Sequence, residues 1–318
     1  MEYKHDQRPS FIYTYASPDE EISLCQLEMR SFFGADAPPN LFRSKIGIDP
    51  SRSPFIRERI EVIYEGDSVA EIVEQVDQIQ THDMTFKVIY VKTNDLEPSQ
   101  KIEFDEARVI ERELGWHING EADVRKPDYV FGIVTLGGRW YFGNYRKSKT
   151  VWLQHQKKPR SYSIALPTRV ARAAANIAVP HPDGVKAIDP CCGIGTVLVE
   201  ALSMGIDIVG RDINPFIARG ARENIAHFGY DCEVALGSIA DITETYDAAI
   251  IDMPYNHFSR ITSEGQFSIL QHARRIASKV VVIANEPMDE MLTSAGFTIA
   301  DHAVARKGSF SRHIIVCL

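Results

Sequence analysis

The sequence predicts an α/β protein with two parts, of which the C-terminal part is a doubly wound parallel sheet. A length of 318 residues fits about two domains. Between residues 183 and 318, apolar strand patterns alternate with helical patterns, as expected for a parallel sheet with crossover helices. The strands are expected near 185–190, 206–211, 247–252 and 279–284, and the helices near 195–204, 214–227 and 264–277. Residues 1–150 mix both element types without this alternation and predict a small α+β binding domain.

Capping signals and turn residues place the elements of the N-terminal part. Ser17 followed by Pro18 predicts the start of a helix that runs toward Phe33. Ser68 with Glu71 forms a second capping-box pattern before apolar residues at helical spacing. We also expect a strand over 85–92, a helix over 105–114 that ends at Gly115, and strands over 129–136 and 139–145 joined by a turn at Gly137-Gly138.

Composition narrows the class of protein. Apolar residues make up 44% of the chain and charged residues 25%, as in soluble globular proteins. No run reaches the roughly 18 apolar residues of a membrane span, and the first charges are followed by no apolar leader, so we expect a cytoplasmic protein with no membrane partner. The five cysteines are scattered without a CxxC pair, which predicts free thiols and no metal site.

The segment from Tyr129 to Pro182 is basic, although the net charge of the chain is −8. It contains nine Lys and Arg and no Asp or Glu, a pattern typical of an anion-binding face. The predicted RNA-binding residues are Arg139, Arg146, Lys147, Lys149, Lys157, Lys158 and Arg160. Aromatic residues are interleaved with them at Trp140, Tyr141, Phe142, Tyr145, Trp152 and Tyr162, either to stack on unpaired bases or to fill a core. The alternative to RNA binding is a solvated linker face with ordinary core aromatics. Residues 151–182 are expected to form a basic linker between the two parts of the chain.

The turn after the first strand of the C-terminal part is rich in glycine. It reads Asp189-Pro-Cys-Cys-Gly-Ile-Gly-Thr196, and its glycines let the backbone approach a ligand. Leu198 stands where a dinucleotide fingerprint needs its third glycine, which argues against NAD or FAD. Asp212 follows the next strand, 23 residues after Asp189, close to the spacing of a carboxylate that accepts ribose hydroxyls. The alternative is that Asp212 caps the following helix, for which Asn214 is the better candidate.

The strand over 246–251 ends in Asp252-Met253-Pro254-Tyr255-Asn256. A carboxylate, a carbonyl that Pro254 orients and an aromatic face can hold a planar base that bears an exocyclic amine. Alone, the motif Asp252-Met253-Pro254-Tyr255 is a weak signal, because Asp-X-Pro is also a common turn. The motif lies at the end of a strand, as do the two turns at Asp189 and Asp212. This position predicts that it holds the reacting group of a substrate beside a bound cofactor.

These stretches resemble the THUMP-domain RNA guanine-N2 methyltransferases, a group that contains tRNA enzymes. The resemblance covers 164–257 and lies in LPTRVARAAAN at 166–176, DPCCGIGTVLVEAL at 189–202, VGRDINPFIARGARENIAHFG at 209–229 and IIDMPYN at 250–256; a fainter one over 60–150 implies a THUMP-like RNA-binding domain. Two positions depart from the family pattern. Met253 stands for a proline. If the turn is a working variant, Met253→Pro is expected to be tolerated or to raise activity; in a protein without catalysis it is expected to leave methylation at background. Ser238 stands where an acid usually meets the adenine amine, and Asp241 is a substitute we do not favour.

The resemblance implies a Rossmann-like class I methyltransferase that uses S-adenosylmethionine (SAM) and transfers its methyl group to the N2 amine of a guanosine in RNA, most simply tRNA. The implied catalytic residues are Asp252, Pro254 and Tyr255, and the implied cofactor-binding residues are Asp189, Cys191, Gly193, Gly195, Thr196, Asp212, Ile213, Ser238, Ile239 and Asp252. Open alternatives are a non-catalytic protein that binds SAM and RNA, and an amino methyltransferase of DNA or of a protein glutamine. A partner subunit is not indicated.

Overall fold

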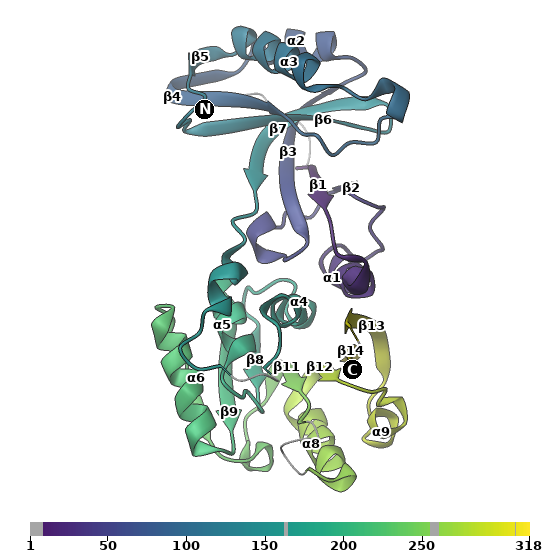
Figure 1. The fold of residues 1–318 in the computed structure, drawn as a ribbon, viewed down its shortest axis with the longest axis vertical. Coiled ribbons are helices and arrows are strands. Elements are labelled where there is room, and N and C mark those ends of the chain that lie inside the picture. Colours follow the sequence, from purple (N-terminus) through teal and green to yellow (C-terminus); the bar gives the residue numbers. More distant parts are fainter. Residues whose placement is uncertain (1–8, 162–164, 255–260, 309) are drawn as a thin grey trace. The chain divides into compact units, whose positions relative to one another are not determined.

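The computed structural model describes residues 9–161, 165–254, 261–308 and 310–318, which form two compact units. The described residues of the first unit are 9–16, 37–51 and 55–149, and those of the second are 17–36, 52–54 and the part from Thr150 onward. Each unit contains one seven-stranded sheet. Figure 1 shows both units as ribbons. Among the described residues, no helix combines the length and the apolar character needed to cross a membrane.

The first unit is a mixed sheet covered on one face by two helices. The strand order is β2-β1-β3-β7-β6-β4-β5. The elements are β1 (Phe11–Tyr15), β2 (Leu41–Ser44), η2 (Pro50–Arg52), β3 (Ile56–Gly66), α2 (Val69–Val76), β4 (Gln80–Tyr90), η3 (Pro98–Gln100), α3 (Phe104–His117), β5 (Asn119–Ala122), β6 (Tyr129–Leu136) and β7 (Arg139–Lys147). Helices α2 and α3 lie side by side on the sheet (Figure 1). The period-2 alternation of strands divides their side chains between two cores, so that Ile133 joins the core under these helices and Val134 the one on the other face.

The turn and capping residues of this unit form the predicted hairpin and helix start, whereas one helix end differs from the prediction. Gly137 and Gly138 both have positive φ, 63° and 74°, and close the predicted hairpin with Leu136 opposite Arg139. Ser68 caps α2 by accepting from the Glu71 N–H. The predicted end of α3 at Gly115 was wrong, because the helix continues to His117. A glycine inside a helix costs only about 1 kcal/mol, and burial of the neighbouring Leu114 outweighs that cost.

The second unit is the predicted doubly wound sheet, in the order β10-β9-β8-β11-β12-β14-β13. Its elements are η1 (Asp19–Glu21), α1 (Ile22–Phe33), η4 (Val151–Gln156), α4 (Thr168–Ala178), β8 (Lys186–Asp189), α5 (Thr196–Ser203), β9 (Asp207–Asp212), α6 (Pro215–His227), β10 (Val234–Leu236), η5 (Ile239–Asp241), β11 (Tyr246–Asp252), α8 (Ser263–Ile276), β12 (Ala277–Ala284), α9 (Asp289–Ser294), β13 (Ile299–Lys307) and β14 (Phe310–Cys317). The first five strands are parallel, as predicted. The last two strands, for which no prediction was made, form an antiparallel hairpin, and β14 pairs with β12.

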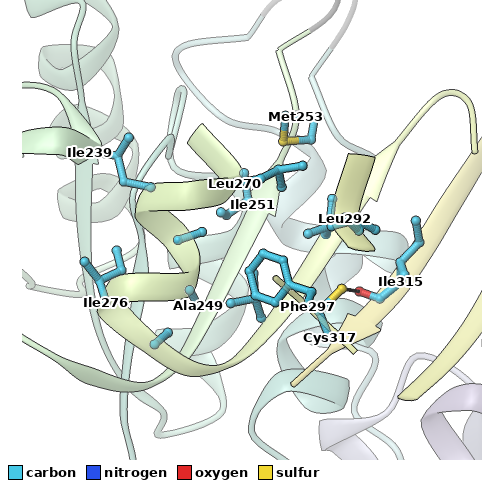
Figure 2. Packing of buried hydrophobic residues seen from close by; sticks show 14 of the residues in the cluster. Ile239, Ala249, Ile251, Met253, Leu270, Ile276, Leu292, Phe297, Ile315 and Cys317 are labelled. Atoms are coloured by element: carbon cyan, nitrogen blue, oxygen red, sulfur yellow. Dashed lines mark hydrogen bonds between the residues drawn. The ribbon is translucent and has the colours of Figure 1, made fainter. Parts of the chain in front are cut away.

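Alternate residues of the central strands pack against the helices on one face. Ala249 and Ile251 of β11 contact the cluster that Leu270 of α8 and Leu292 of α9 complete (Figure 2). Met253, which follows β11, belongs to the same cluster and is 1% exposed. This packing fixes the carboxyl end of β11, where the predicted Asp252 turn begins.

The division into units differs from the predicted boundaries at two segments. Residues 17–36, expected in the N-terminal part, form η1 and α1 of the second unit, where Arg30 pairs with Asp301 at 2.8 Å. Residues 151–182, expected as a basic linker, contain η4 and α4. Helix α4 is buried along almost its whole length because it packs between α1 and α5.

Buried polar groups of α1 and α4 form a hydrogen-bonded network. Glu28 is fully buried and accepts hydrogen bonds from Ser53 and from the Asn176 amide, the latter at 2.7 Å. Burial raises the pKa of Glu28 from its ordinary value of 4.5 to about 7, and the hydrogen bonds with Ser53 and Asn176 offset part of this rise. Glu28 therefore changes its charge near neutral pH.

Candidate functional site

The loop between β8 and α5 is shaped by two glycines and by Asp212. Gly195 has φ +78°, and a Cβ on it would lie 3.2 Å from the Cβ of Ala221, so this position requires glycine. Because Gly195 is also the N-cap residue, no side chain caps the first turn of α5. The Gly193 N–H donates to Asp212 at 2.9 Å and ties the loop to the end of β9. The open N-terminus of α5 offers N–H donors and the positive end of a helix dipole.

Asp212 does not cap α6. Asn214 does so, since its side-chain oxygen accepts from the Phe216 and Ile217 N–H groups. The two Asp212 oxygens accept from the Gly193 and Asn214 N–H groups at 2.9 and 2.8 Å. Each carboxylate oxygen has a further lone pair, so Asp212 can also accept hydroxyl groups of a ligand. The alternative of Asp212 as a helix cap is thereby removed.

A cavity of about 750 Å³ opens where β8, β9 and β11 end. Its wall contains Asp189, Asp212 and Asp252, one from the end of each strand, as expected at the carboxyl edge of a parallel sheet. Of the predicted cofactor residues, Cys191, Gly193, Thr196, Ile213, Ser238 and Ile239 also line it, whereas Gly195 does not and acts through the shape of the loop. Pro254 lines it too, and Tyr255 lies outside the described residues.

The three carboxylates make the cavity strongly acidic. Burial raises the pKa of Asp189 well above its usual range, and the nearby charges of Asp252 and Asp212 raise it further. Burial also raises the pKa of Asp212, while its two backbone hydrogen bonds lower it. Among the described residues no Lys or Arg lines the cavity. This environment favours a ligand that carries positive charge and hydroxyl donors.

Asp252 stands at the reacting end of the predicted site. Its carboxylate lies 3.9 Å from the Arg312 guanidinium of β14, and both side chains are about one fifth exposed, 23% and 19%. Arg312 was not predicted, because β14 follows β11 by some sixty positions and nothing in the local sequence joins them. An adjacent guanidinium favours the ionised form of a carboxylate, the form that accepts hydrogen bonds from an amine.

Met253 replaces the family's proline in a position that uses its backbone N–H. That N–H donates to the Ile283 carbonyl of β12 at 2.9 Å, and proline has no such donor. Figure 2 shows the Met253 side chain beyond Ile251 at the end of β11. The expectation that Met253→Pro is tolerated is therefore reversed, since the change would leave the Ile283 carbonyl without this partner.

Ser238 and Asp241 bind each other instead of both facing the cavity. The Ser238 hydroxyl accepts from the Ala240 N–H, and the Asp241 carboxylate accepts from the Ser238 N–H, which forms a capping box on η5. Ser238 lines the cavity, and Asp241 does not. Asp241 therefore does not take the place of the missing acid at this wall.

Helix α8 supplies a wall that the sequence analysis missed. Gly265, Ser268, Ile269 and His272 line the cavity together with Ile261. Their spacing of three and four positions marks one helix face. That periodicity was a usable signal, but it is also the pattern of any amphipathic helix against a sheet.

Much of the positive charge of the basic segment is balanced in the folded chain, because its arginines form ion pairs with Asp and Glu residues outside the segment. Arg139 pairs with Glu65 and Asp67, Arg146 with Asp49, Arg160 with Glu223, Arg169 with Glu21, and buried Arg172 with Glu200. Lys147, Lys149 and Lys157 are exposed and have no side-chain partner in the described part of the chain. Arg139 to Lys149 belong to the first unit, and Lys157, Lys158 and Arg160 to the second.

The interleaved aromatics serve mainly as core residues. Tyr141, Phe142 and Trp152 are buried, and Trp140 packs against the core under α2 and α3. The Tyr145 hydroxyl donates to Glu58 at 2.8 Å. Of the two interpretations, base stacking and core filling, core filling therefore holds for these five residues. Tyr162 lies outside the described residues.

Comparison with known proteins agrees with this geometry. Residues 156–283 match the family model described as RMKL-like, methyltransferase domain. A tRNA (guanine(10)-N2)-dimethyltransferase of Methanothermobacter thermautotrophicus is 28% identical over 80% of this chain and 76% of its own length. The U6 snRNA (guanine-N(2))-methyltransferase THUMPD2 of Mus musculus is 29% identical over 58% of this chain and 35% of its own.

Among solved structures, TrmN from Thermus thermophilus has the same fold, with a TM-score of 0.50 at 15% identity over 97% of this chain and 99% of that one. The predicted resemblance to guanine-N2 methyltransferases and the predicted class of SAM-dependent enzyme are confirmed by the family and the relatives. The chain is therefore a methyltransferase whose residues 156–283 are similar to the RMKL-like methyltransferase domain.

Proposed function

We propose that this methyltransferase transfers a methyl group from SAM to the exocyclic N2 amine of a guanine in RNA, with tRNA as the substrate. The observation that carries the proposal is the convergence of Asp189, Asp212 and Asp252 on one cavity at the edge of a parallel sheet. The names of the relatives support the acceptor, because they include tRNA and snRNA guanine-N2 methyltransferases.

The cavity fits SAM in size and in chemistry. About 750 Å³ is within the range of ligand pockets of this kind. Asp212 has the lone pairs to accept ribose hydroxyls, Ile213 and Ile239 offer apolar surface for an adenine ring, and the uncapped N-terminus of α5 suits a carboxylate. When bound, SAM supplies an electrophilic methyl group on a cationic sulfur.

Asp252 and the carbonyl groups beside Pro254 act on the acceptor amine. Its nitrogen lone pair is delocalised into the base, so hydrogen bonds from both N–H groups to these acceptors favour pyramidal nitrogen and stabilise the positive charge that develops on it. The rest of the rate enhancement comes from positioning the amine against the methyl group with water excluded. The excess proton leaves the nitrogen after transfer.

RNA binding is proposed for the first unit together with the basic segment. We propose that residues of about 60–150 form a THUMP-like RNA-binding domain, and that Lys147, Lys149 and Lys157 contact phosphates. Their exposure and lack of acidic partners among the described residues support this assignment. The ion pairs of Arg139, Arg146 and Arg160 with carboxylates reduce their expected share of phosphate binding.

Single-turnover methyl transfer from labelled SAM to bulk tRNA tests the function. Mass spectrometry of the digested nucleosides should find N2-methylguanosine, and a label on another base or on none would contradict the proposal. Asp252→Ala should reduce the rate about 100- to 1000-fold and leave SAM affinity nearly unchanged. The control is Asp247→Ala, at the opposite end of the same strand, which should keep the wild-type rate.

A further inference from the structure

Lys158, a predicted RNA-binding residue, contacts Thr196 in the wall of the proposed cofactor cavity and does not itself line that cavity. The ammonium group donates to the Thr196 hydroxyl at 3.1 Å. Thr196 is the first residue of α5, is 5% exposed and lines the cavity. Lys158 itself is half-buried, whereas its neighbour Lys157 is exposed. The two adjacent lysines therefore have different surroundings.

A cation at this place is unfavourable for the protein alone. The N-terminus of a helix carries partial positive charge, so a lysine beside it is repelled. Burial lowers the pKa of Lys158, which means that its environment disfavours the charged form, and Glu200 offsets only part of this. The two Glu200 oxygens already bind His155 and Arg172, at 2.8 and 2.7 Å. An anion in the cavity would compensate this cation.

The hydrogen bond also sets what Thr196 can do. Because its oxygen accepts from Lys158, the Thr196 O–H is directed away from the ammonium group as a donor. The described wall of the cavity is otherwise rich in carboxylates and contains no Lys or Arg. The end of the cavity at Thr196, with the uncapped α5 beside it, is thus where negative charge is best accommodated.

We propose that Lys158 is a positioning residue for the cofactor, acting through Thr196 to bind the carboxylate of the methionine part of SAM. This inference rests on the proposed SAM site. It assigns Lys158 to cofactor selection and not to RNA binding. The cationic sulfur and the ammonium group of SAM are then left to the acidic part of the cavity, so that the two ends of the ligand are distinguished by charge.

Decarboxylated SAM is the discriminating probe, because it lacks only the carboxylate. Calorimetric titration of Lys158→Met should show SAM binding weakened about tenfold or more, as for the loss of a charge-assisted interaction, and decarboxylated SAM changed by less than about threefold. Lys157→Met, the matched control, should leave both affinities and their ratio unchanged. RNA affinity should be the same in Lys158→Met as in the wild type.

Two further variants keep the test decisive if Lys158→Met folds poorly. Thr196→Val removes the hydroxyl at constant size and should give the same selective loss of SAM affinity. Thr196→Ser keeps the hydroxyl and should bind SAM like the wild type. Equal weakening of both ligands, or unchanged SAM affinity, would overturn the role of Lys158. Failure of the wild-type protein to bind SAM would instead contradict the proposed function, so the two failures are distinguishable.

Discussion

Replacing Met253 by proline, the residue of the family pattern, should destabilise the protein. The Met253 N–H donates to the carbonyl of Ile283, a residue with no exposed surface, and proline removes that donor. Leaving a buried carbonyl without its partner costs about 1–3 kcal/mol. The shorter side chain loses about one methylene group of burial, or about 1 kcal/mol. The free energy of unfolding should therefore fall by about 2–4 kcal/mol.

Urea unfolding with a matched control separates these two contributions. Met253→Val has as many side-chain carbons as proline and keeps the N–H, so it should lose only the packing part, about 1 kcal/mol. The difference between the two variants measures the hydrogen bond. Methyl transfer per folded molecule should not exceed the wild-type rate in Met253→Pro. A proline variant as stable as the valine variant, or more active than the wild type, would refute this reasoning.

Three other predictions concern pH, the cofactor and RNA. Between pH 4.5 and about 7 the folded protein keeps a proton on Glu28 that the unfolded chain has lost, so the free energy of unfolding should fall as pH rises, by up to about 3 kcal/mol. The Glu28→Gln variant should lack this fall, and parallel pH profiles of the two proteins in urea unfolding would exclude the prediction. Asp212→Ala should weaken SAM binding by about 10- to 100-fold in calorimetry, and unchanged affinity in a folded variant would remove Asp212 from the site. Alanine at Arg146, Lys147 and Lys149 should flatten the slope of log RNA affinity against log salt by up to about 0.7 to 0.9 per lost phosphate contact, with less from Arg146 because it pairs with an acid; an unchanged slope would show that RNA binds elsewhere.

The local sequence by itself determined the alternation of strands and helices in the second unit, the Gly137-Gly138 hairpin and three of the carboxylates at the cavity. These features follow from periodicity, from turn residues and from the rule that parallel strands end at one edge, none of which needs a distant contact. Asp189, Asp212 and Asp252 were accordingly predicted together and lie in one wall.

Tertiary structure alone decided the direction and the partner of the charged side chains. Lys158 and Arg172 look like members of one basic run, yet the first faces Thr196 and the second is buried against Glu200. Arg312 reaches Asp252 from a strand that no local pattern connects to it. Periodicity reports whether a position is inside or outside, whereas an ion pair depends on which distant carboxylate the folded chain brings within a few ångströms, and that is a property of the complete fold.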